Sequence, residues 1–151
     1  MLDDVDRRLL RYLQSDPDEP LSSLAERAGT TLAVASRRLS RMREGGIIRA
    51  QEAVIDWAAL GYSVEVSLRI ALDKTETNAF DQFEAEARKV PEVIELQTFL
   101  GRVDVRLSII ARDMQHYQRI YRDKILTLPF IADIEALMHV SRIKANEALP
   151  V

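Results

Sequence analysis

The chain has 151 residues, of which 47% are hydrophobic and 30% are charged, a composition typical of one ordinary or two small folded domains. It contains no cysteine, which excludes a disulfide framework and a thiolate metal site. No run approaches the roughly 18 apolar residues of a membrane span, and no signal peptide is apparent. We therefore expect a cytoplasmic protein that does not enter membranes.

The net charge of −3 hides an uneven distribution of charge along the chain. Residues 1–50 contain 9 arginines and 8 acidic residues, whereas residues 51–151 contain 12 basic and 16 acidic residues. Within residues 27–50, six arginines accompany Glu44 as the only acid. A basic segment on an acidic chain favours a specific anionic partner, because a general polycation would be basic throughout.

Three short helices are predicted in the first fifty residues. The first begins after Asp3, a good N-cap, and the second ends at Gly29. The third begins after Thr31, another good N-cap, and ends at Gly45-Gly46. Two helices joined by a tight turn, of which the second is basic outside, are typical of a helix-turn-helix.

The third helix has two contrasting faces at 100° per residue. Its apolar seam consists of Leu32, Ala35, Leu39 and Met42. Its outer face consists of Ala33, Ser36, Arg37, Ser40, Arg41 and Glu44. Small residues on this face permit close approach to a DNA groove, although a solvated surface helix could carry the same residues.

The arginines of this region predict two kinds of DNA contact. Arg37 and Arg41 project from the outer face, and we expect one of them to pair with a guanine edge. Arg38, Arg43 and Arg49 are expected to contact phosphates, which set affinity and register. The complete predicted DNA-binding set is Thr31, Ala33, Ser36, Arg37, Arg38, Ser40, Arg41, Arg43 and Arg49.

The rest of the chain changes to strand periodicity and predicts a ferredoxin-like β-α-β-β-α-β order. The expected elements are a strand over 64–72, a helix over 77–90, a hairpin of strands 92–100 and 103–111, a helix after Asp113, and a strand over 131–140. In the second helix we expect Met114, Tyr117, Tyr121 and Leu128 to point inward. Because both helices cover one face of the sheet, the other face, with Glu65, Arg106, Leu137 and His139, is expected to be buried in a second copy.

The hairpin turn at residues 101–104 has two interpretations. It could be an ordinary tight turn in which Gly101 supplies a positive φ. Alternatively, its amides, Arg102 and Asp104 could bind the charged ends of an amino acid, with apolar residues such as Ala136 beside the ligand's side chain. The predicted effector-binding set is Gly101, Arg102, Val103, Asp104 and Ala136, and no metal or cofactor is expected.

Seven segments, taken in order, resemble the Lrp/AsnC family of transcription regulators. They are LDDVDRRLLRYLQ, LAERAGT, RRLSRMREGGII, VIDWAALGY, VPEVIELQTFLGRVD, ARDMQHYQRIYRDKI and the C-terminal IK. The resemblance implies an α+β chain with a winged-type helix-turn-helix and a ferredoxin-like RAM domain. It also implies dimers, often assembled into octamers, that bind amino acids at subunit interfaces.

The expected organisation is a DNA-binding domain over 1–50, a connector over 51–61, an effector and oligomerisation domain over 62–144, and a tail over 145–151. The predicted function is transcription regulation, not enzyme activity, through a palindromic operator in double-stranded DNA and a small-molecule effector. Two alternatives remain open. One is an enzyme on the same scaffold, similar to sirohaem decarboxylases, and the other is an architectural protein that binds DNA without an effector.

Overall fold

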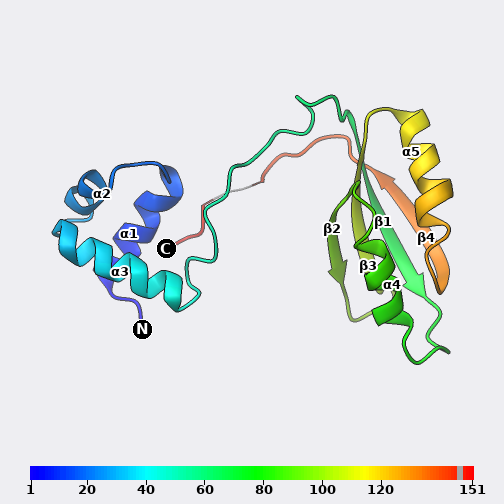
Figure 1. Cartoon of the computed structure of the whole chain (residues 1–151), viewed down its shortest axis with the longest axis horizontal. Helices are drawn as coiled ribbons and strands as arrows, with labels where there is room; N and C mark the ends of the chain where they lie inside the picture. The colour runs from blue at the N-terminus through cyan, green and yellow to red at the C-terminus, as the bar shows by residue number, and fades with distance from the viewer. Residues whose placement is uncertain (146–147) are drawn as a thin grey trace. The chain divides into compact units, whose positions relative to one another are not determined.

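The computed structural model describes residues 1–145 and 148–151 and divides the chain into two compact units (Figure 1). The helical unit contains Met1–Val54 together with Ile143–Val151, and the sheet unit contains Ile55–Arg142. Each unit has a hydrophobic core of its own. Residues 146–147 of the predicted tail lie outside the described residues.

The helical unit contains α1 (Asp4–Ser15), α2 (Leu21–Arg27) and α3 (Leu32–Glu44). The predicted caps are confirmed. Asp3 forms a capping box with Asp6, and the Thr31 hydroxyl accepts a hydrogen bond from the Val34 N–H at 3.3 Å. Gly29 has a φ of +67°, the left-handed conformation that lets the chain turn sharply between α2 and α3.

The core of the helical unit comes from the apolar stripes of its three helices. Its buried members are Leu9, Leu10, Leu24, Ala25, Ala28, Ala35, Leu39 and Met42. Leu32 was expected in this seam but is 53% exposed, because the residue after an N-cap lies in the first helical turn, at the edge of the packed cluster. The C-terminal segment belongs to the same unit, since Val151 packs on this core and the Leu149 N–H donates to Gln14 Oε1.

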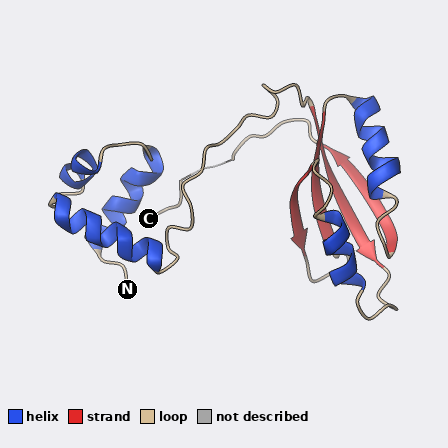
Figure 2. Ribbon diagram, in the orientation of Figure 1, coloured by secondary structure: helices blue, strands red, loops and turns tan. Residues whose placement is uncertain are grey.

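The sheet unit has the predicted β-α-β-β-α-β order (Figure 2). Its elements are β1 (Val64–Leu72), α4 (Ala79–Ala87), β2 (Val93–Thr98), β3 (Val105–Ala111), α5 (Met114–Ile120) continued by a π-helical turn (Tyr121–Ile125), and β4 (Ile131–Met138). The four strands lie in the order β2-β3-β1-β4, and every neighbouring pair is antiparallel. This topology is the ferredoxin-like arrangement.

Alternation along the strands gives the sheet one covered and one open face. Alternate residues of β1 and β3, such as Leu68 and Leu107, are fully buried with Phe83 of α4 and Ile120 of α5. Met114 was expected to point inward but is 43% exposed, because it directly follows the cap Asp113. Neither helix covers the opposite face of the sheet. We call it the open face, and its residues include Ser67, Arg69, Arg106 and Ser108. No helix within the described residues is long and apolar enough to cross a membrane.

The core of the sheet unit makes a direct stability prediction. Leu107→Ala should reduce the free energy of unfolding by about 2–5 kcal/mol, because it leaves a cavity in a fully buried layer. Leu126→Ala is the matched control, since Leu126 is exposed and should cost less than about 1 kcal/mol. Urea unfolding followed by the fluorescence of Trp57, the single tryptophan and part of this unit, measures both. Equal losses would contradict the assigned core.

Candidate nucleic-acid interface

The outer face of α3 is exposed as predicted. Ala33, Ser36, Arg37, Ser40 and Arg41 are all exposed, while Ala35, Leu39 and Met42 on the opposite side are buried. Arg43, Arg49 and Thr31 are exposed as well, whereas Arg38 on the flank is half-buried. The face therefore combines small side chains with arginines on a capped helix.

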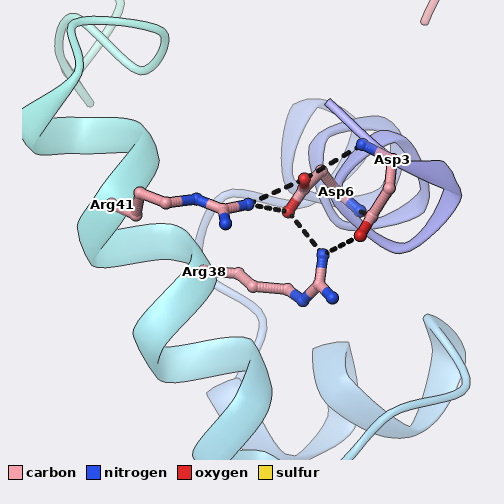
Figure 3. A network of polar contacts seen from close by, with 4 residues as sticks. All are labelled: Asp3, Asp6, Arg38 and Arg41. Carbon is pink, nitrogen blue, oxygen red and sulfur yellow. Dashed lines mark hydrogen bonds and ion pairs between the residues drawn. The ribbon is translucent and has the colours of Figure 1, made fainter. Parts of the chain in front are cut away.

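Two of these arginines are engaged by acids of the first helix (Figure 3). Arg41 Nη2 donates to both carboxylate oxygens of Asp6, at 3.0 and 2.8 Å. Arg38 Nη1 donates to Asp6 Oδ1 at 3.0 Å and also to the Asp3 carboxylate. No role was predicted for Asp6, and the expected DNA contacts of Arg38 and Arg41 compete with these pairs.

The ion pairs differ in burial. Asp6 has no exposed surface, whereas Asp3 is exposed and the Arg41 side chain is 62% exposed. The hydrogen bond from Arg38, together with the Asp6 N–H, lowers the pKa of Asp3 from 3.8 to about 2. The bond to Asp3 and then that to Asp6 raise the pKa of Arg38 above its usual value.

Acidic residues from outside residues 27–50 pair with some of the arginines of that segment, so its excess of positive charge is smaller in the folded unit than the sequence suggests. Arg27 pairs with Glu19 at 2.8 Å and lies over the Tyr12 ring, so half of the six arginines have acidic partners outside that segment. A signal for this pairing existed. Asp6 lies on the same helical stripe as Leu9, Leu10 and Leu13, and an acid on an apolar stripe needs a cation when it is buried.

The effector-binding prediction needs correction at Asp104. Its side chain is only 3% exposed, not presented at the turn surface. Its carboxylate accepts from the Leu72 N–H at 2.8 Å and pairs with Lys74 Nζ at 3.0 Å. Both carboxylate oxygens have partners within the chain, so the Asp104 side chain links the hairpin to the end of β1. Gly101, with a φ of +149°, lies in the exposed part of the turn.

A cavity of ≈ 370 Å³ lies beside this hairpin. Arg102 and Val103 of the predicted set line it, and sequence reasoning missed its other lining residues, Arg69, Ala71, Asp133 and Glu135. The strand register explains the missed residues, because Arg69 faces Glu135 and Ala71 faces Asp133 across β1 and β4. Ala136 is not in this cavity. It faces Leu68, whose side chain belongs to the covered side of the sheet.

A helix-turn-helix with an exposed basic helix, followed by a ferredoxin-like unit, defines a DNA-binding transcription regulator with a separate ligand-binding domain. Comparison with known families agrees with this class. Residues 2–49 match the model for a winged helix-turn-helix DNA-binding domain, and residues 65–149 match that for the Lrp/AsnC ligand binding domain. The chain belongs to the Lrp/AsnC family of transcriptional regulators.

Similar proteins support the same assignment along the whole chain. The HTH-type transcriptional regulator Zrp of Zymomonas mobilis is 29% identical over 99% of this chain and 97% of its own. The DNA-binding transcriptional activator DecR of Escherichia coli is 26% identical over 100% and 99%. A transcriptional regulator of Neisseria meningitidis, solved in complex with L-Met, superposes with a TM-score of 0.92 at 25% identity over 99% and 97%. These relatives are regulators, not enzymes, as predicted for this chain.

The Asp3–Arg38 pair predicts how the helical unit responds to acid. Because the folded pKa of Asp3 is lowered, its contribution to stability is present above the ordinary pKa of 3.8 and is lost as the pH falls towards about 2. Asp3→Asn keeps a capping side chain but removes the charge. The difference in melting temperature between wild type and Asp3→Asn, measured by circular dichroism, should therefore shrink over this pH interval.

The control for this experiment is Asp4→Asn, which removes an exposed charge one residue further along. Its melting temperature should differ little from that of the wild type throughout. A difference for Asp3→Asn that stays constant across the interval would show that the ion pair adds nothing to stability.

Proposed function

We propose that this regulator binds an imperfect palindrome as a homodimer and that an amino acid controls it. The observation that supports sequence-specific binding is the outer face of α3, where exposed small residues surround Arg37 on a capped helix after a tight turn. Small side chains let the helix approach base edges, and an unpaired guanidinium can bind guanine through two donors.

The contacts to DNA divide by type. Ala33, Ser36 and Ser40 give close approach to the major groove, with Arg37 reaching base edges. Arg43 and Arg49, both exposed and without an ion pair among the described residues, bind phosphates. The N-cap Thr31 lies at the helix N-terminus, where backbone N–H groups also favour a phosphate.

The open face of the sheet supports the proposed dimer. The small residues Ser67 and Ser108 face each other across β1 and β3 and are largely buried, so neither side chain projects into the space that another sheet would occupy. Beside them, Arg106 Nε is buried and has no hydrogen-bond partner within the described chain. A second copy packed on this face could supply an acceptor, and dimers joined in this way could assemble further, up to the octamer expected for the family.

The cavity beside the hairpin supports an amino acid as the effector. Arg69 and Arg102 offer cations to a carboxylate, while Asp133 and Glu135 offer acceptors to an ammonium group. A zwitterion needs these opposite charges on the two sides of one site. The complex of the Neisseria meningitidis relative with L-Met shows that a similar protein binds an amino acid.

Selection from a random duplex library tests the DNA part of this proposal. The full chain should enrich an imperfect palindrome whose half-sites lie about one helical turn, or a multiple, apart. Ser67→Arg, which places a bulky charge on the open face, should yield a monomer that enriches a single half-site. Ser22→Arg, an exposed position on α2, should remain dimeric in light scattering. A Ser67→Arg dimer that still selects a palindrome would contradict the proposed interface.

The effector prediction uses a panel of the twenty amino acids. At least one should shift the melting temperature of the wild type and change its affinity for the selected duplex. Asp133→Asn and Arg69→Gln should each lower the affinity for that amino acid at least about tenfold, because a charged hydrogen bond is lost. Asp81→Asn removes an exposed acid on α4 and should respond as the wild type does. A wild type that responds to none of the twenty would leave an architectural DNA-binding protein as the better interpretation.

A further inference from the structure

We propose that Asp6 is a positioning residue that holds the guanidinium groups of Arg41 and Arg38 through ion pairs, so that Arg37 alone among the outer-face arginines of α3 identifies bases. This inference rests on the proposed sequence-specific function and assigns its specificity to one side chain. It also gives the negative charge of α1 a role in DNA binding.

The buried carboxylate of Asp6 needs both of its cations. Asp6 has no exposed surface, and its two oxygens receive the Arg41 and Arg38 guanidinium groups and the Asp3 N–H at 3.1 Å. If Arg41 moved to a base, this carboxylate would keep the Asp3 N–H but only one cation, Arg38, which Asp3 also engages. A buried carboxylate that loses a cation is strongly disfavoured. Arg41 therefore stays on Asp6 when the helix meets DNA.

The geometry of the Arg41 guanidinium also disfavours a base contact. Guanine is recognised by two parallel N–H donors, and each of the two donor pairs that a guanidinium offers in this way includes Nη2. In Arg41 this nitrogen is the one within 3.0 Å of both Asp6 oxygens. Arg41 can thus present a donor to a phosphate while bound to Asp6, but each of its donor pairs contains the nitrogen that Asp6 engages (Figure 3).

Arg37 differs from Arg41 in its partners. It lies one helical turn before Arg41 on the same outer face, it is exposed, and it has no ion pair or side-chain hydrogen bond among the described residues. Its guanidinium keeps both donor pairs for DNA. The two arginines are equivalent in sequence but not in structure, and Asp6 makes the difference.

The experiment measures binding of the full chain to two duplexes, one selected by the wild type and one of random sequence. Arg37→Gln should lose more than tenfold in affinity for the selected duplex and much less for the random one. Arg41→Gln should change the affinity for the two duplexes by about the same factor, because Arg41 contacts no base. Loss of more than tenfold for Arg41→Gln on the selected duplex alone would overturn the proposal, because Arg41 would then read a base.

Salt dependence tests the role of Asp6 directly. Asp6→Asn frees Arg41, so it should tighten binding to the random duplex several-fold and steepen the slope of log affinity against log salt by about one. Asp4→Asn makes the same charge change at an exposed site without an ion pair among the described residues, and should leave the slope unchanged. The double variant Asp6→Asn/Arg41→Gln should return the slope to that of the wild type. An unchanged slope in folded Asp6→Asn would contradict the holding role.

Two further outcomes remain decisive. If circular dichroism shows that Asp6→Asn does not fold, the comparison of Arg37→Gln with Arg41→Gln on the selected and random duplexes still decides which arginine reads the base. If the wild type enriches no motif, sequence-specific binding itself fails. The salt slopes on random DNA then still report whether Asp6 holds Arg41.

Discussion

The buried carboxylate of Asp6 is the constraint on which the DNA-binding unit depends. A unit of three short helices has a small core, so ion pairs between its helices add to what packing provides. An acid with no exposed surface must meet cations, and both of its cations come from α3. The pairing therefore fixes the rotation and axial position of the recognition helix relative to α1. The same geometry decides which side chains face outward.

The sheet unit follows a different physical rule, because its two faces are unequal. Both helices bury one face in a continuous apolar core, and the open face carries charged residues between small ones. Charged side chains on a sheet face can contact either water or a complementary protein surface. Across β1 and β4 the register places Arg69 opposite Glu135, so cations and acids gather at one end of the face, beside the hairpin. A site for opposite charges thus arises from strand pairing rather than from the turn.

Local patterns predicted the elements of this chain well, and tertiary pairing limited the rest. Caps such as Asp3 and Thr31 and the alternation of β1 are local signals, and the structure confirms them. Leu32 and Met114 fit the helical period but lie in first turns, where the period no longer implies burial. Asp104 appeared to be an exposed turn residue because nothing in its neighbourhood shows that Leu72 and Lys74 approach its carboxylate. The partners of Arg38 and Arg41 lie more than thirty residues away, beyond any charge count made over a short window.

The arginines that this acidic chain concentrates in α3 thus have two competing roles. Free guanidinium groups increase affinity for any DNA, since each phosphate contact releases counterions whatever the sequence. Groups held by Asp6 give up part of that general attraction while Arg37 remains free for base edges. Specificity depends on the ratio of specific to non-specific affinity, because competing genomic sites vastly outnumber the operators. Ion pairing of two cations with Asp6 therefore lowers non-specific affinity more than specific affinity. A recognition helix with fewer available charges therefore discriminates better than its arginine content suggests.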